Sequence, residues 1–365
     1  MVIDVTTFQG AGGSWIGARR SLADDIPHVG IEWDHDACRT VTAAGGHAIR
    51  ADVASFPLGP LVGRVRLFQA SPPGTSFSAS GTRAGTGCVD FVYRCLADLA
   101  AGMDTRAETI AACAATIRPT LGAAPKSWRG TPDEWGAARA TELATQTVLV
   151  VEPLRWALTI RPRCIVLEQV PAVLPIWHAT ARHLRDIGYS VAVGTLSAEQ
   201  FGVPQTRNRA YLVASLDGPV VAMPVPTHQR FEPGVPAGGS PDCEESLFGP
   251  GLRPWVSMAE ALGWGVDRPS FTISGGGGES QWELRPATTI NGDDRLSKPG
   301  HHGPVKGESS QYGAIPTKLT TEQGLILMGW PADWPLQGSK MSKWKQVGNG
   351  CCPQVIEALV SAAAK

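Results

Sequence analysis

The stretch VIDVTTFQGAGGSWIGARR, residues 2–20, decides the fold of this chain. Its apolar beginning, residues 2–6, predicts a strand. The glycines of FQGAGG follow, and a helical pattern then runs over 16–22. A strand, a glycine-rich turn and a helix together bring backbone close to a ligand and aim N–H groups at it. Dinucleotide folds and plain tight turns share this arrangement, so the stretch alone indicates the fold class and not the ligand.

Apolar segments alternate with helical patterns as far as residue 217. Besides residues 2–6, strands are expected at 29–32, 65–69, 164–168, 189–194 and 210–215, with helices over 147–160 and near 177–187. Such alternation is typical of a mostly parallel sheet, which gathers its functional loops at the carboxyl ends of the strands. We therefore predict an α/β fold and expect the site in the loops that follow the strands.

The composition fits one large domain, or a large domain with a smaller one. Of the 365 residues, 43% are hydrophobic and 18% are charged, which supplies a core and excludes a disordered chain. The net charge is -1. Because the chain has no overall basic balance, contact with nucleic acid would depend on local clusters of Arg and Lys.

Eight cysteines are scattered along the chain without a CxxC pair or a cluster of Cys and His at zinc spacing. We interpret them as reduced structural thiols and expect no metal site. The first residues, MVIDVTTFQGAGG, lack a charged segment followed by an apolar one, and no run of about 18 apolar residues occurs. These patterns predict a soluble, cytoplasmic protein that does not contact a membrane.

Two segments of the sequence differ in composition and periodicity from the rest. Between 218 and 300 Pro and Gly become dense and helical periodicity fades, which predicts a smaller, irregular domain. Residues 103–147 form a partly helical insertion with a middle rich in Pro, Gly and Trp. We expect residues 1–217 to form the main domain and residues 301–365 to return to it, with a helical pattern from 319 onward.

The glycine turn, a Glu-Trp pair and an aspartate at three successive strand ends together indicate a cofactor that contains adenosine. Glu32 is placed to bind ribose hydroxyls, and Trp33 offers a plane on which adenine could stack. Asp52, at the third strand end, can accept a hydrogen bond from an adenine amino group. Each residue alone could be a cap or a turn residue, but the three together favour the cofactor site.

Several segments match the motifs of one family in that family's order. They are FQGAGG, GIEWD, RADV, SPPGTSFS, LEQVPAV, GVPQTRNRAYLVA and QVGNGCCP. On these segments the chain resembles the DNA (cytosine-5)-methyltransferase family through nearly its whole length. Chance could explain any single match but is a poor explanation of the ordered set.

The resemblance implies a Rossmann-like, S-adenosylmethionine-dependent methyltransferase fold in which residues 218–300 are the target-recognition domain. S-adenosyl-L-methionine would be the cofactor and S-adenosyl-L-homocysteine the product. By resemblance, the residues that bind the cofactor are Phe8, Gly10, Gly12, Gly13, Glu32, Trp33, Asp52, Val53, Pro73, Leu149 and Asn349.

The family's chemistry assigns roles to three further residues. Cytosine C5 is a poor nucleophile, so the family adds a Cys thiolate to C6 and the resulting enamine-like C5 attacks the methyl group. Glu168 stands where the family's glutamate acts near N3. Arg209 would hold the base near O2, and Arg207 would contact the backbone or order the loop. The base must leave the helix for this chemistry, so base flipping is implied. A solvated ion pair between Glu168 and Arg209 is the alternative.

The nucleophile position is the main departure from the family. In SPPGTSFS it is occupied by Gly74 instead of Cys, and glycine has no group that can form the covalent bond. The neighbouring hydroxyls are far weaker nucleophiles than a thiolate. Cys88 and Cys164 match no nucleophile position, and Thr75 and Gln169 replace the family's Gln and Asn. We expect cofactor and DNA binding to survive and turnover to be lost or strongly impaired, whether the glycine is natural or engineered.

The implied partner is double-stranded DNA. Contacts are expected at Ser78 and Gln205, and in the polar loop RPATTINGDDRLSKPGHHG, where Arg285, Asn291 and Arg295 are suited to base edges. ATTI in this loop resembles the family's threonine motif. The lysines of segment 340–345 could touch phosphates, but a solvated basic face explains them equally well.

Alternatives remain open. The chain could bind S-adenosylmethionine and DNA and act by occupancy, without catalysis. It could instead alkylate a modified pyrimidine that needs no thiolate. A dehydrogenase that uses a nicotinamide dinucleotide would share the first motif, but EQV, QTRNR and QVGNG argue against it. A monomer in the bacterial nucleoid or in a phage-infected cell, with a role in restriction and modification, is the expected setting.

Overall fold

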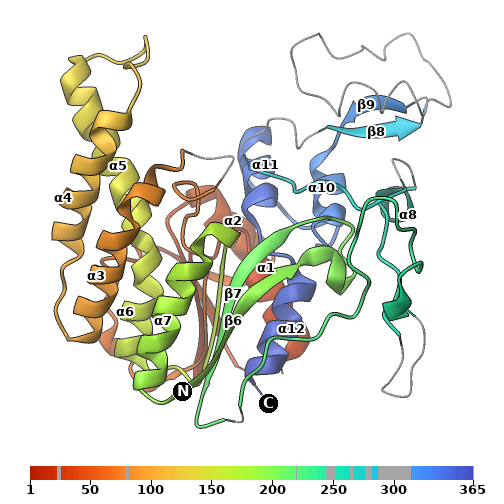
Figure 1. The fold of residues 1–365 in the computed structure, drawn as a ribbon, viewed down its shortest axis with the longest axis horizontal. Coiled ribbons are helices and arrows are strands. Elements are labelled where there is room, and N and C mark those ends of the chain that lie inside the picture. The colour runs from red at the N-terminus through yellow and green to blue at the C-terminus, as the bar shows by residue number, and fades with distance from the viewer. Residues whose placement is uncertain are drawn as a thin grey trace.

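The computed structural model describes residues 1–22, 26–78, 82–218, 220–243, 251–263, 267–275, 282–286 and 314–364, with 282–286 and 314–318 described by their backbone alone. Figure 1 shows a central sheet with helices packed against its faces. Within the described residues, no helix is long and apolar enough to cross a membrane.

Seven described strands form the central sheet in the order β3-β2-β1-β4-β5-β7-β6. They are β1 (Ile3–Thr7), β2 (His28–Glu32), β3 (His47–Arg50), β4 (Val65–Ala70), β5 (Cys164–Gln169), β6 (Tyr189–Ser197) and β7 (Asn208–Leu216). The pairs from β3 through β5 are parallel, whereas β7 runs antiparallel to both β5 and β6. The mostly parallel sheet expected from the sequence is confirmed.

Side chains of the central strands alternate between two apolar clusters, one on each face of the sheet. In β5, Ile165 and Leu167 belong to one cluster and Val166 to the other. Every residue of β5 is buried. A strand covered on both faces is apolar nearly throughout, which explains why the sequence pattern at 164–168 indicates a strand without a polar face.

The helices divide between the two faces. One cluster is covered by α3 (Val89–Ala100), α4 (Arg106–Ile117), α5 (Pro132–Val148), α6 (Glu152–Ile160) and α7 (Leu174–Asp186). The other is covered by α1 (Gly13–Ser21), α10 (Thr321–Leu327), α11 (Lys340–Asn349) and α12 (Pro353–Ala363). Helix α2 (His35–Ala43) packs beside β2 and β3. The fold is therefore an α/β arrangement with both faces of the sheet covered.

The C-terminal helix packs directly on the first helix. A Cβ added at Gly17 of α1 would lie 2.6 Å from Ile356 Cβ and 2.6 Å from Pro353 O of α12. A side chain at Gly17 would therefore push the two helices apart. The end of the chain lies against its beginning, so the segments around residues 10 and 350 meet at one edge of the sheet.

The helix expected over 147–160 is interrupted, so that expectation of a continuous helix is wrong. Helix α5 ends at Val148, a 3-10 turn occupies Leu149–Val151, and α6 begins at Glu152. Pro153 lies in the first turn of α6. Proline lacks the backbone N–H that a continuous helix would need at this position, but it fits well in a helix's first turn.

Two parts of the chain extend beyond the sheet. Helices α4 and α5 stand side by side at one end of Figure 1, and the hairpin of β8 (Trp282–Pro286) and β9 (Ala314–Lys318) lies near the other. The short helix α8 (Met258–Leu262) lies in the segment expected to recognise the target. The assignment of residues 218–300 as a recognition domain stays a prediction.

Candidate active site

The residues singled out in the sequence meet at one edge of the sheet. Loops follow the carboxyl ends of the parallel strands β1, β2, β3, β4 and β5, and these ends share an edge. The glycine turn follows β1, the Gly74 loop follows β4, and Glu168 lies at the end of β5. After the roles predicted from the sequence, we call the part on β1 to β3 the cofactor side and the part on β4, β5 and β7 the base side.

The turn after β1 is held in a conformation that few residues adopt. Phe8, Gly10 and Gly12 have φ angles of 53°, 55° and 103°. The N–H of Gly10 donates to Glu32 Oε2 at 2.8 Å, while Asp34 N–H donates to Glu32 Oε1 at 2.8 Å. A Cβ at Gly10 would meet no atom within 4 Å. The turn is thus fixed by the Glu32 carboxylate and leaves open space beside Gly10 for a ligand.

The C-terminal segment holds the other side of this turn. A Cβ at Gly13 would lie 2.5 Å from Cys351 O and 2.5 Å from Trp330 Cζ2. Trp330 Nε1 donates to Cys351 O at 2.8 Å, and Trp334 Nε1 donates to Ala11 O at 2.9 Å. Close packing against backbone explains why Gly13 carries no side chain. The two tryptophans had no signal in the sequence that linked them to the glycine turn.

The candidate residues for adenosine binding differ in how far their surroundings bury or hold them. The side chain of Trp33 is 69% exposed, as an aromatic face that receives a ligand needs to be. Asp52 accepts hydrogen bonds from Ala54 N–H at 3.0 Å and from Ser55 Oγ at 3.3 Å. Val53 is buried. Asp52 therefore orders its own loop, and the same carboxylate remains half-buried at the edge where adenine is expected.

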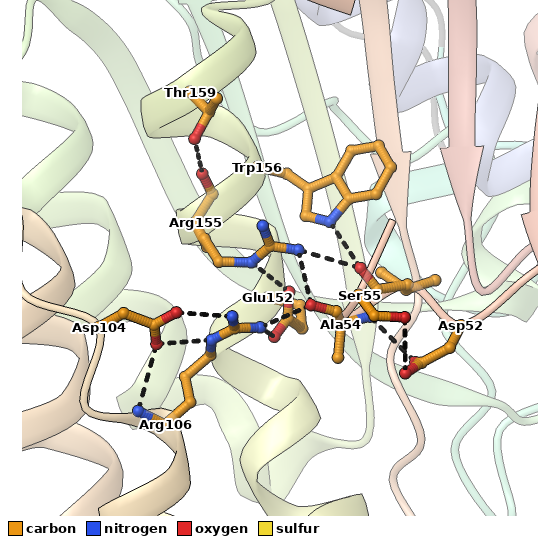
Figure 2. A network of polar contacts seen from close by, with 10 residues as sticks. Asp52, Ala54, Ser55, Asp104, Arg106, Glu152, Arg155, Trp156 and Thr159 are labelled. Carbon is orange, nitrogen blue, oxygen red and sulfur yellow. Dashed lines mark hydrogen bonds and ion pairs between the residues drawn. The ribbon is translucent and has the colours of Figure 1, made fainter. Parts of the chain in front are cut away.

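A polar network fixes the loop that follows Asp52 (Figure 2). Arg155 Nη2 donates to Val53 O at 3.0 Å, and Arg106 Nη1 donates to Ala54 O at 2.9 Å. Both guanidinium groups also pair with Glu152, at 2.5 Å from Arg106 and 2.7 Å from Arg155. Because the Glu152 side chain is only 2% exposed, its charge is compensated by two cations in a dry environment.

Sequence reasoning missed this network. Trp156 Nε1 also donates to Val53 O, at 3.2 Å, so two neighbouring residues of α6 hold the same carbonyl. The spacing of Glu152 and Arg155 on one helix was a signal for a local ion pair. No sequence pattern could show that Arg106, 46 residues earlier, completes it.

On the base side, Glu168 and Arg209 form an ion pair, a possibility that the sequence left undecided. Arg209 Nε lies 3.2 Å from Glu168 Oε1, and the two side chains are 14% and 10% exposed. Burial, followed by the nearby charge of Arg207, lowers the pKa of Arg209 to about 10, against the attraction of Glu168. Arg209 therefore stays charged near neutral pH. The pair is largely withdrawn from water, unlike a solvated surface pair.

Two cysteines of the C-terminal segment lie beside Glu168. Cys351 Sγ donates to Glu168 Oε2 at 3.7 Å, and it also lies 3.3 Å from Ser71 Oγ. Burial raises the pKa of Cys351 to about 12 and that of Cys352 to about 11. Neither therefore supplies a thiolate nucleophile near neutral pH. Cys351 instead gives the second oxygen of Glu168 a hydrogen-bond donor.

The Gly74 loop is closed by a neighbouring amide. A Cβ at Gly74 would lie 2.6 Å from Gln169 Cδ and 2.8 Å from Nε2, and closer still to Oε1. Gln169 is 5% exposed; its Nε2 donates to Pro72 O, and its Oε1 accepts from Val170 N–H at 2.5 Å. The Gly74 carbonyl accepts from Phe77 and Ser78 N–H groups at 3.0 and 2.9 Å. The space next to Gly74 is therefore filled by the Gln169 amide.

Arg207 and Gln205 are directed into the protein. Arg207, 4% exposed, donates to Ile273 O at 3.0 Å and to the carbonyls of Gly348 and Gly350 at 3.1 and 3.0 Å. Gln205, fully buried, donates to Leu327 O at 3.0 Å and accepts from Ile273 N–H at 2.9 Å. Arg207 thus orders the segments around it. A contact of Gln205 with DNA would require it to give up these partners.

The remaining candidates have less distinctive surroundings. Pro73, Leu149 and Ser78 are half-buried, and Asn349 is exposed. The Asn349 side chain packs on Gly275, where an added Cβ would lie 2.6 Å from Asn349 Oδ1. The side chain of Arg285, and the whole of Asn291 and Arg295, lie outside the described residues. No group of three or more metal-ligating side chains gathers in the part of the chain that the structure describes.

Solved structures with the same arrangement of sheet and helices identify the fold. Solved structures with the same fold include the *S. pombe* Dnmt2 methyltransferase, 15% identical, with a TM-score of 0.54 over 99% of this chain and 98% of that one. The *Entamoeba histolytica* methyltransferase EhMeth is 13% identical, with a TM-score of 0.53 over 100% and 98%. The chain has the Rossmann-like fold of S-adenosylmethionine-dependent methyltransferases.

Sequence comparison finds similarity to one family over part of the chain. The family model described as C-5 cytosine-specific DNA methylase matches residues 134–234. The Type II methyltransferase M.NaeI of *Lentzea aerocolonigenes* is 29% identical over 56% of this chain and 50% of its own length. M.NlaX of *Neisseria lactamica* is 26% identical over 59% and 67%. The family match therefore covers residues 134–234 of this chain, and the chain spans about half to two thirds of the length of these relatives.

Proposed function

We propose that this protein binds S-adenosylmethionine and double-stranded DNA as a cytosine-5 methyltransferase whose covalent step is lost or strongly impaired. The observation that carries the proposal is the buried Glu168–Arg209 pair beside the Gly74 loop, at the edge where the glycine turn also lies. The Type II methyltransferase relatives support a place in restriction and modification. A monomer within the nucleoid remains our expectation for its setting.

The cofactor side fits S-adenosylmethionine, which supplies an electrophilic methyl group when bound. The space beside Gly10 is free of protein atoms and Trp33 is exposed, so backbone and an aromatic face are available to a ligand. Glu32 is already oriented by two backbone N–H groups and would bind ribose hydroxyls. Asp52, on the loop fixed by Arg106 and Arg155, would accept from the adenine amino group.

The base side fits a flipped cytosine. Glu168 would hold a proton near N3, where a carboxylic acid stabilises an adduct at C6. Arg209, charged near neutral pH, would bind O2 and keep the carboxylate in place. Both groups are held inside the protein before any ligand arrives, so binding requires little rearrangement of the protein at this point.

The covalent step lacks a nucleophile. No thiolate is available at position 74, and the two thiols nearest Glu168 are protonated near neutral pH. Unactivated hydroxyls such as that of Thr75 attack C6 far less readily. The Gln169 amide beside Gly74 also favours the alternative function, occupancy of DNA without catalysis, because it fills the space from which a nucleophile would act.

Methyl transfer tests the proposal. Tritiated methyl groups from S-adenosylmethionine would be counted on unmethylated genomic DNA with the unaltered chain, Gly74→Cys, and Gly74→Cys combined with Gln169→Asn. We expect no transfer by the unaltered chain and more transfer by the double variant than by Gly74→Cys, because the shorter amide leaves room for the thiol. Gly59→Cys is the matched control. A Cβ at Gly59 meets no atom within 4 Å, and the thiol added there lies outside the Gly74 loop.

The outcomes separate the candidate functions. Strong transfer to ordinary DNA by the unaltered chain would overturn the missing-nucleophile proposal. Transfer by that chain to DNA with modified pyrimidines, and not to ordinary DNA, would favour alkylation without a thiolate. DNA binding with no transfer by any variant would favour occupancy. Failure to bind S-adenosylmethionine in calorimetry would rule out all three.

A further inference from the structure

The helical insertion forms an arm that none of the family motifs covers. We define the arm as α4, the tip 118–131, and α5. In Figure 1 the arm rises at one end of the sheet and extends beyond its carboxyl edge, while the β8–β9 hairpin lies toward the other end. The two features therefore flank the edge at which the site residues meet.

The tip is basic and exposed. Residues 118–130 hold Arg118, Lys126 and Arg129 and no acidic residue, in a chain whose net charge is -1. Lys126 and Arg129 are exposed. Among the described residues they form no ion pair, whereas Arg118 pairs with Asp133 at the start of α5. Two cations of the tip are therefore available to a partner.

Two acidic residues begin α5; Asp133 pairs with Arg118, and Glu134 has a structural role of its own. Glu134 N–H donates to Thr131 Oγ1 at 3.2 Å, and the Glu134 carboxylate accepts from Thr131 N–H at 2.7 Å, which makes a capping box at the start of α5. The carboxylate also accepts from Thr131 Oγ1 at 3.0 Å. These hydrogen bonds lower the pKa of Glu134. Glu134 is thus used to begin the helix, and it does not neutralise Lys126 or Arg129 by direct pairing.

An aromatic side chain lies between the two cations in the sequence. Trp128 is 39% exposed, its Nε1 donates to Thr131 O at 3.1 Å, and its backbone N–H donates to Pro125 O at 2.9 Å. Hydrogen bonds at both the indole and the backbone restrict its position. A restricted, partly exposed indole next to Lys and Arg is the combination that proteins use against nucleic-acid backbone and bases.

The arm is anchored at both roots to the site. At the start of α4, Arg106 joins the network with Glu152 and Ala54 that Figure 2 shows. Near the end of α5, Gln146 Oε1 accepts from Thr75 Oγ1, next to Gly74, at 3.3 Å. Fifteen residues of helix separate Gln146 from Thr131, which is about 22 Å at 1.5 Å per residue. The tip is thus held at a set distance from the Gly74 loop.

We propose that the tip of the arm is a second DNA contact, in which Lys126 and Arg129 bind backbone phosphates of the duplex several base pairs from the flipped base and Trp128 packs against the same strand. This inference rests on the proposed function, because it requires DNA seated over the site. The distance of about 22 Å corresponds to six or so phosphate steps of about 3.4 Å along one strand. The arm thereby lengthens the footprint without reading sequence.

The salt dependence of DNA binding tests the inference. Fluorescence anisotropy would compare the unaltered chain with Lys126→Ala/Arg129→Ala on a mixed-sequence duplex of about 40 base pairs, over a range of salt concentrations. Loss of two phosphate contacts should reduce the slope of log K against log salt by about 1.8. On a duplex of about 8 base pairs, too short to reach the tip, the two proteins should bind alike. Affinity for S-adenosylmethionine should not change.

A matched double variant controls for charge alone. Arg163→Ala/Arg182→Ala removes two exposed cations, of which Arg163 directly precedes β5 at the opposite edge of the sheet, and it should leave the slope unchanged. DNA binding by the unaltered chain with equal slopes for the tip variant and this control would overturn the inference alone. Binding of an acidic peptide through the tip, without a change in DNA slope, would also overturn it. No DNA binding by the unaltered chain would overturn the proposed function as well.

Discussion

The cofactor side and the base side of the site differ in what surrounds their glycines. A side chain added at Gly10 would enter open space, and the carboxylate of Glu32 already holds that turn from the other side. A side chain added at Gly74 would meet the amide of Gln169, which is buried and hydrogen-bonded to Pro72 and Val170. The first glycine leaves room for a ligand, whereas the room at the second is taken by the protein.

A chain can lack the catalytic nucleophile and still keep the residues that would bind the substrate and the cofactor. The groups that would hold the base, Glu168 and Arg209, remain paired and largely buried. The loops that carry the proposed cofactor-binding groups are held by contacts with α6, α4 and the C-terminal segment. In the proposed function, glycine at position 74 therefore leaves both binding surfaces in place without a covalent link to the substrate.

The largest effect is expected where the two sides are joined. Arg207→Met would leave the carbonyls of Ile273, Gly348 and Gly350 without their buried donor. Each unsatisfied group costs about 1–3 kcal/mol, so we expect the free energy of unfolding to fall by about 3–5 kcal/mol in urea titration. Binding of cofactor and DNA should weaken together. Arg182→Met, at an exposed position, should change stability by less than about 0.5 kcal/mol.

Each unsatisfied carbonyl should cost about 1–3 kcal/mol. If Arg207→Met lowers the free energy of unfolding by less than about 1 kcal/mol, solvent or neighbouring donors replace the guanidinium. That result would also show that the C-terminal segment does not depend on the base side for its position. The comparison between the two sides would then describe two independent units.

A smaller effect is expected from a change confined to the cofactor side. Arg155→Met removes the donor to Val53 O and Ala54 O while Arg106 still pairs with Glu152. We expect affinity for S-adenosylmethionine to fall about tenfold, equivalent to about 1.4 kcal/mol, because the Asp52 loop loses part of its support. Calorimetry measures this change. DNA affinity in the absence of cofactor should be unaltered.

Arg139→Met is the matched control for that experiment, since Arg139 pairs with Glu142 on the exposed face of α5. Such pairs contribute little, so cofactor affinity should match that of the unaltered chain. If Arg155→Met also binds the cofactor normally, the network of Figure 2 supports the fold and not the cofactor loop.

The smallest effect concerns acid. Burial, with a further contribution from Arg66, lowers the pKa of His28 from 6.5 to about 3. Between pH 6.5 and 3 the unfolded chain binds a proton at His28 that the folded chain does not, so this residue makes stability fall as the pH falls. We expect His28→Gln to reduce the loss of unfolding free energy between pH 7 and about pH 5.7 by about 1 kcal/mol. Urea titrations at the two pH values measure it, and an unchanged difference would contradict the assignment.

Much of the fold could be predicted from the sequence because it depends on short periodic patterns. The apolar run at 164–168 and the strand at 29–32 correspond to β5 and β2, and the glycine turn leads from β1 into α1 as expected. The order of strands was not readable, because it depends on crossovers and on packing across the sheet. The break between α5 and α6 was missed because Pro153 fits a first turn as well as it ends a helix.

Candidate site residues could be named from the sequence where the expected chemistry requires one residue type at one strand end. Glu32, Glu168 and Arg209 are of this kind, and the structure places Glu168 and Arg209 together. The supporting residues were not predictable in the same way. Arg106, Trp330 and Cys351 act through contacts with distant segments, and many side chains could have filled those places.

By itself, the sequence determined the fold class, the family motifs and the absence of a thiol at position 74, since all three follow from which residues stand in which order. Only the tertiary structure decided what occupies the space beside Gly74 and what holds the Asp52 loop. Those outcomes depend on side chains from other strands and helices meeting in three dimensions. A glycine in a sequence is an absent side chain; the fold determines whether its place stays open or is filled by Gln169.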